Sequence, residues 1–163
     1  MTAKTGEEFI KHEFDEAIAI QQAIVEAERQ LSISHPFPEA KQAIKSLMAT
    51  DQQQLQKLQQ QGKQYGATGE AEEVASSMKQ LMQATAQKAT EAQSDAYEAH
   101  AVLLSLKRKQ QDSASAVVKI AGAMKETLLK TEAQKMLKDT KAGAEQLAKS
   151  LANFAVVIAK QPS

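Results

Sequence analysis

Apolar residues recur along this chain every three or four positions, which is the spacing of one face of an α-helix. The first stripe contains Ile10, Ala17, Ile20, Ile24, Ala27 and Leu31. It follows Thr5-Gly6-Glu7-Glu8, a capping-box sequence whose hydroxyl and carboxylate can bond the first amides of a helix. It stops before Pro36, because the residue preceding a proline avoids the α region. These signals predict a first helix over residues 5–33.

A second stripe begins after Pro38, a residue that suits the first turn of a helix. Its members are Ala43, Leu47, Met48, Leu55 and Leu58. The glutamine-rich run over residues 51–61 keeps the helical spacing, so we interpret it as a solvated helix face and not as a disordered tract. Glycine is the usual terminator of a helix. Tyr65-Gly66 therefore predicts a second helix over residues 38–65.

Helix boundaries are less marked farther along, since no glycine or proline occurs between Gly69 and Gly122. Capping-box patterns at Thr90 to Gln93 and at Thr131 to Gln134 permit two breaks. The apolar stripe also changes phase. The earlier stripe contains Val117, Ile120, Met124 and Leu128, and the later one contains Leu137, Thr140, Ala144, Leu147, Leu151, Phe154 and Ile158.

These signals predict two further core helices over residues 91–111 and 131–160, with accessory short helices over 70–88 and 113–130. The alternative is two continuous helices over 70–111 and 113–160. Helix-forming residues dominate and strand-type alternation is absent. The predicted fold class is therefore all-α, a four-helix bundle with accessory short helices. It forms a single domain over residues 1–163, with frayed ends at 1–4 and 161–163.

Charge and composition exclude several partners. The chain holds 20 basic and 20 acidic residues, so no net field attracts nucleic acid or an anionic membrane. The acidic residues prevail in residues 1–100 and the basic ones in residues 101–163, and we expect the two parts to attract each other within the bundle. Lys107-Arg108-Lys109 is interpreted as a cluster at a helix end, where it complements the helix dipole, and not as a nucleic-acid site.

The cellular setting follows from what the sequence lacks. Cysteine is absent, which removes disulfides, thiolate catalysis and cysteine-ligated zinc. The opening residues have no apolar stretch of the kind found in a signal peptide. The longest apolar run, residues 154–159, is too short to span a bilayer. We therefore expect a soluble, cytoplasmic protein with no membrane partner.

Candidate metal ligands are few. A di-metal site in a bundle uses Glu-x-x-His pairs, which place two ligands on one inward face, and this chain has no such pair. If a metal binds, Glu28 on the first apolar stripe is the best candidate, followed by Glu13, His12 and Glu16. Glu13 and Glu28 lie about 22 Å apart along a helix and cannot share one site. His12 and Glu16 are interpreted as a surface pair, and His35 as an exposed turn residue.

Two segments carry a resemblance to a known family. Residues 26–31, Glu-Ala-Glu-Arg-Gln-Leu, resemble the first helix of the ferritin-like stress proteins of the YciF type, which read roughly D-A-E-K-Q-L there. Residues 54–58 and Gly66 resemble the Q-V-E-R-L run and the terminal glycine of their second helix. The resemblance implies a ferritin-like bundle with Glu28 at the first-helix ligand position. The other ligand positions fall on Leu47, Thr50, residues 96–100 and residues 142–144, which lack the family's ligand pattern.

The resemblance implies a ferritin-like bundle without an intact di-metal centre and with no catalytic or cofactor-binding residues. Such a protein acts by binding or association, as a homo-oligomer (a dimer) or with a protein partner, and by analogy in stress responses. Residues 67–90 are then expected to form a crossover with a short helix, which makes the second and third core helices parallel. One alternative is a carboxylate-bridged di-iron or di-manganese oxidase. Another is an unrelated helical interaction bundle with up-down-up-down connections.

Overall fold

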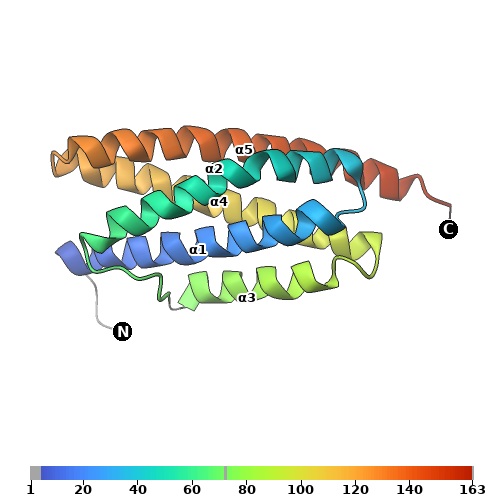
Figure 1. The fold of residues 1–163 in the computed structure, drawn as a ribbon, viewed down its shortest axis with the longest axis horizontal. Helices are drawn as coiled ribbons and strands as arrows, with labels where there is room; N and C mark the ends of the chain where they lie inside the picture. The colour runs from blue at the N-terminus through green and yellow to red at the C-terminus, as the bar shows by residue number, and fades with distance from the viewer. Residues whose placement is uncertain (1–4, 72, 163) are drawn as a thin grey trace.

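The computed structural model describes residues 5–71 and 73–162, and all regular structure in these ranges is helical. The helices are α1 (Gly6–Ser34), α2 (Pro38–Lys63), α3 (Glu73–Lys88), α4 (Gln93–Ala123) and α5 (Thr127–Ala159) (Figure 1). The all-α prediction is confirmed. The predicted frayed residues 1–4 and 163 lie outside the described residues, and α5 ends just before the other two predicted frayed positions, 161 and 162.

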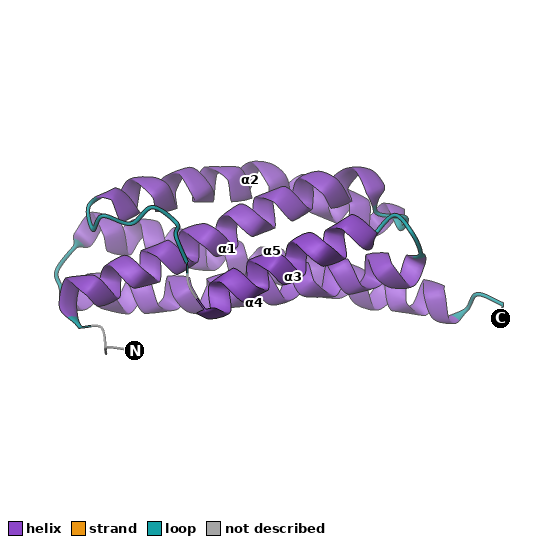
Figure 2. Cartoon of the chain, turned by 90° about the horizontal axis from the view of Figure 1, so that it is seen from below, coloured by secondary structure: helices purple, strands orange, loops and turns teal. Residues whose placement is uncertain are grey.

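The four long helices pack as a closed ring, in which α1 contacts α2 and α4, and α5 contacts the same two helices. The shorter α3 lies outside this ring, against α1 and α4 (Figure 2). Residue periodicity explains the arrangement, because every residue of the first predicted stripe is buried on the inward face of α1. One apolar stripe per helix suffices to close a bundle of this kind.

The chain crosses over between the second and third long helices. The colours of Figure 1 show α2 running back along α1, α3 returning in the direction of α1, and α4 running in the same direction as α2. The crossover predicted over residues 67–90 is therefore present, with α3 as its short helix. Antiparallel neighbours need only a short loop, whereas parallel ones require a connection that spans the bundle.

An aspartate of α1 fixes the start of this crossover. The Asp15 Oδ1 atom accepts hydrogen bonds from the backbone N–H groups of Thr68 and Gly69, at 2.7 and 3.0 Å. Its Oδ2 atom accepts one from Lys11 at 2.7 Å. Burial opposes ionisation, but the Lys11 bond and the two backbone bonds together hold the Asp15 pKa below its usual value. The loop after α2 is thereby tied to α1 by two charge-assisted bonds.

The predicted accessory helix over residues 113–130 is wrong, and so is the alternative of continuous helices over 70–111 and 113–160. Helix α4 continues through residues 112–123, and the helical structure is interrupted at residues 124–126 before α5 begins. The Glu126 N–H donates to Ala121 O at 2.9 Å and the Lys125 N–H to Gly122 O at 3.3 Å. These are the two bonds of a Schellman cap. Lys125 occupies its left-handed position with a φ of 60°, where glycine is usual.

The same cap ends α2 with its expected residue. Ala67 N–H donates to Gly62 O at 2.9 Å, and Gly66 takes the left-handed position with a φ of 75°. The glycine at position 66 allows the end of α2 to be predicted from the sequence, whereas the lysine at position 125 does not predict the end of α4. The predicted apolar stripe through Met124 and Leu128 is wrong, because both side chains are exposed.

The predicted capping box at Thr5 is also wrong, because the Thr5 side chain makes no hydrogen bond to the first turn of α1.

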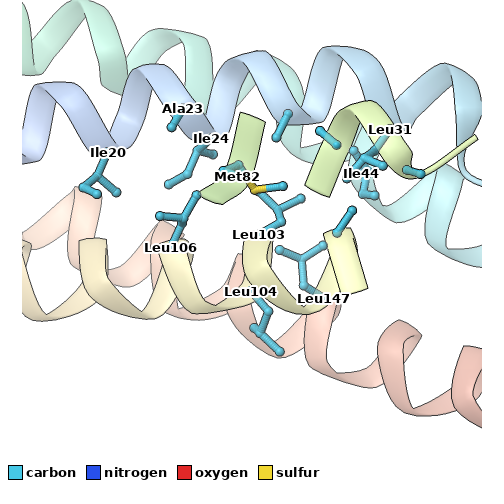
Figure 3. Close-up of a cluster of buried hydrophobic side chains, with 14 of the residues drawn as sticks. Ile20, Ala23, Ile24, Leu31, Ile44, Met82, Leu103, Leu104, Leu106 and Leu147 are labelled. Atoms are coloured by element: carbon cyan, nitrogen blue, oxygen red, sulfur yellow. The ribbon is translucent and has the colours of Figure 1, made fainter. Parts of the chain in front are cut away.

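The core consists of two apolar clusters along the bundle axis. The larger one brings together side chains of all five helices; Figure 3 shows Met82 of α3 among Ile24 of α1 and Leu103 of α4. The second lies toward the N-terminal half of α1 and includes Phe14, Leu58 and Val117. Several buried polar side chains lie among these clusters inside the bundle.

Candidate functional site

A buried ion pair joins α2 to α4 inside the bundle. The Lys107 Nζ atom lies 2.7 Å from each carboxylate oxygen of Asp51, and both bonds are buried. The two side chains are 2% and 1% exposed, respectively. Two charges removed from water this completely must be paired, because an isolated buried charge is strongly unfavourable. The Lys107 ammonium therefore satisfies Asp51 from inside the protein.

Glu28 of α1 completes this cluster as a neutral acid. It is 0% exposed, and no donor among the described residues bonds either of its oxygens. Burial, followed by the hydrogen-bonding and the charge of the neighbouring Asp51 carboxylate, raises the pKa of Glu28 to about 10, although Lys107 acts to lower it. At neutral pH Glu28 therefore keeps its proton. The cluster holds one negative and one positive charge.

Two glutamines hold the cluster in register. The Gln21 Nε2 atom donates to the backbone oxygen of Asp51 at 2.9 Å. The Gln110 Nε2 atom donates to Ala17 O at 2.9 Å and to Gln21 Oε1 at 3.0 Å. All three bonds are buried, so they link α1 to α2 and α4 through the apolar core. The Gln110 Oε1 atom has no hydrogen-bond partner among the described residues, so the network is held by the two glutamine Nε2 groups.

α5 supplies space for the lysine. A Cβ atom added at Gly143 would lie 3.2 Å from Lys107 Cε and 3.3 Å from both Lys107 Nζ and Leu47 Cδ2. These distances are tight, so the absence of a side chain at Gly143 accommodates the lysine. The cluster of Glu28, Asp51, Lys107 and Gly143 thus draws one residue from each long helix. We call it the central ion-pair cluster.

The other predicted ligands do not join it. His12 and Glu16 are partly buried on α1, with His12 Nε2 3.6 Å from Glu16 Oε1. Glu13 is also partly buried. Within residues 5–71 and 73–162, no group of three or more His, Cys, Asp or Glu side chains is arranged to hold a metal ion. The structure therefore separates Glu28 from the candidates at residues 12, 13 and 16.

Sequence reasoning missed two members of the cluster. Lys107 was assigned to a helix end, but it lies in the middle of α4, and that interpretation is wrong. Asp51 was included in the solvated glutamine-rich run, yet it is buried. One signal was available in the sequence. Asp51 follows Ile44 by seven positions and Lys107 follows Leu103 by four, so each lies on the apolar stripe of its own helix. The two side chains carry opposite charges, which is a sign of a buried ion pair.

A second buried polar feature is a histidine pair near the α1–α2 turn. The Phe37 N–H donates to His35 Nδ1 at 3.1 Å. His35 Nε2 lies 3.0 Å from His100 Nδ1, and His100 Nε2 lies 2.9 Å from Leu147 O. Since the first bond makes His35 Nδ1 an acceptor and the last makes His100 Nε2 a donor, both rings are neutral and both tautomers are fixed.

The expectation that His35 is exposed is wrong, because it is 3% exposed and packs against the Phe154 ring at 4.9 Å between centroids. Burial and then the proximity of His100 lower the pKa of His35 to about 4. Burial also lowers the pKa of His100, opposed by its bond to the Leu147 carbonyl. A proton on either ring would turn an acceptor into a donor facing a donor. The pair thus connects the α1–α2 turn to α4 and α5 through hydrogen bonds.

Comparisons with protein-family models, with curated proteins and with solved structures return no match to this chain. The resemblance to the YciF-type family therefore stays a prediction. In the described part of the chain, no helix combines the length and the apolar content needed to cross a membrane.

Proposed function

We propose that this protein is a ferritin-like bundle that acts by binding or association and not by di-metal chemistry. The observation that carries the proposal is the Lys107 ammonium bonded to both oxygens of Asp51 at 2.7 Å in the bundle interior. An ammonium group there neutralises the carboxylate that a divalent cation would otherwise neutralise. The crossover through α3 supports the ferritin-like topology over an unrelated up-down-up-down bundle.

The donor set does not fit a di-metal centre. Such centres in bundles use a glutamate from each of two helices and Glu-x-x-His from each of the others. The Asp51 carboxylate is bound by the Lys107 ammonium, which does not ligate a cation, and Gly143 of α5 offers no ligand beside that lysine. The oxidase alternative would require Lys107 to leave the cluster and four further ligands to join Glu28 and Asp51. We therefore infer no redox step.

Metal analysis tests the proposal directly. The chain is purified from cells grown with added iron and manganese, and bound metal is measured by plasma mass spectrometry. We expect a content far below one ion per chain, in the wild type and in Glu28→Ala alike. Stoichiometric iron, manganese or zinc that disappears in Glu28→Ala would refute the proposal and favour the oxidase alternative.

Self-association, a cytoplasmic location and a stress-related role belong to the same proposal. Val74 and Leu81 support the first of these, because they are 59% and 54% exposed and lie seven positions apart on α3, on one face of that helix. Sedimentation velocity tests this part. We expect a dimer that Leu81→Lys shifts toward the monomer, and a monomeric wild type at high concentration would count against it.

A further inference from the structure

A groove of about 260 Å³ runs between α2 and α5. Its α2 wall is made largely from the glutamine-rich run, whose side chains Gln53, Gln54, Gln56, Gln60 and Gln61 all line it. The interpretation of this run as a solvated face is therefore only partly right. Five amide side chains in one groove offer both donors and acceptors to whatever occupies it.

Gln54 is the strongest sign that the groove has an occupant. Its side chain is only 7% exposed, and its Oε1 atom accepts a bond from Thr140 Oγ1 at 3.4 Å. Its Nε2 atom is buried and has no hydrogen-bond partner among the described residues. An unpaired buried donor destabilises a folded protein. Gln54 also lines the groove, so a turn of its amide toward the groove would let a ligand acceptor supply the missing bond.

The groove is electrically balanced. Glu132 of α5 accepts a bond from Gln61 Nε2 at 2.7 Å and lies 3.8 Å from Lys57 Nζ. Lys135 and Asp139 pair with each other at 2.6 Å. Each carboxylate in the groove thus has a nearby cation, which leaves the uncharged amides as the distinguishing groups. This balance favours an uncharged, hydrogen-bonding ligand over an anion or a cation.

We propose that this groove binds a short, uncharged, extended peptide segment through its backbone amides, with Gln54 donating to a peptide carbonyl. A primary amide presents one acceptor and two donors in a plane, which complements a peptide group. Met136, at the groove wall, can adapt to a small apolar side chain. The described lining residues include no aromatic ring on which a sugar could stack. The inference rests on the proposed function as a binding protein.

The test is a nuclear magnetic resonance titration of the full chain with N-acetyl-alanyl-alanine amide. We expect saturable shifts of the Gln54 side-chain NH₂ signals and of neighbouring amides on α2 and α5. Gln54→Met keeps the length of the side chain but removes the donor, and should weaken binding roughly tenfold, the effect of one hydrogen bond. Gln59→Met, on the exposed face of α2 outside the groove, is the matched control and should bind like the wild type.

Gln56→Ala gives a second variant, at an exposed lining residue whose change does not threaten folding. It should also weaken binding while Gln59→Ala does not. Absence of saturable shifts with the peptide, or equal binding by all variants, would overturn the inference. Binding of glucose in place of the peptide would overturn the ligand class. Neither result alters the metal content, so failure of the groove and failure of the proposed function are told apart.

Discussion

Protonation of the histidine pair should destabilise this protein before most carboxylates are protonated. The neutral hydrogen-bond chain from Phe37 N–H through His35 and His100 to Leu147 O has no place for an additional proton. The pKa of His35 falls from 6.5 in the unfolded chain to about 4 in the fold. Because the unfolded state then binds more protons, stability falls as pH decreases from about 6.5 toward 4.

The magnitude follows from this difference. With a pKa of about 4 in the fold against 6.5 when unfolded, His35 alone should cost about 2 kcal/mol between pH 7 and pH 5, and about 3 kcal/mol by pH 4. The lowered pKa of His100 acts in the same direction. The nearby side chains Ser150, Phe154 and Tyr97 supply no carboxylate that would stabilise an imidazolium.

Urea unfolding followed by circular dichroism at pH 7, 6 and 5 measures the effect as a difference between the wild type and His35→Asn, because the raised pKa of Glu28 acts in the opposite direction in both proteins. In His35→Asn the side-chain oxygen can still accept the Phe37 N–H bond, but the group does not titrate. This variant should be less stable than the wild type at pH 7, and the difference in midpoint should change by roughly 1 M in its favour by pH 5. The partly buried His12 provides a control: His12→Asn should keep the acid dependence. A stability difference between wild type and His35→Asn that stays constant from pH 7 to pH 5 would refute the reasoning.

Three further predictions concern the central ion-pair cluster and the α4–α5 turn. Lys107→Met should destabilise the fold by about 3–5 kcal/mol by leaving Asp51 unpaired, and adding Asp51→Leu should recover most of this loss in urea unfolding. Glu28→Gln should abolish an alkaline loss of stability of about 1.4 kcal/mol per pH unit, because the folded acid keeps a proton up to about pH 10 that the unfolded chain releases. Equal slopes from pH 6 to 9 in the wild type and the variant would contradict this. Lys125→Gly should raise stability by about 1 kcal/mol in thermal unfolding, because Lys125 has a φ of 60° and glycine carries no left-handed penalty; Gly66→Lys at the equivalent position of α2 should lower stability by a similar amount.

Periodicity predicted most of the helical framework because it is a local property. The first two helices were located closely because a proline or a glycine lies near each of their ends, and Gly69 precedes the crossover helix. The break at residues 124–126 was missed because Lys125 forms the cap that glycine forms at Gly66. Lysine has no preference for the left-handed region, so the local sequence does not predict this conformation.

The sequence by itself determined the all-α class, the inward face of α1 and the position of Glu28 on its apolar stripe, because each follows from spacing within one helix. The tertiary structure alone decided the partners of Glu28. Asp51 and Lys107 are 56 positions apart and come from helices whose relative rotation and depth are fixed only when all four pack together. The same holds for the histidine pair, 65 positions apart, and for the groove between α2 and α5. Helical spacing shows which side chains face inward, but side-chain packing between helices sets which of them meet.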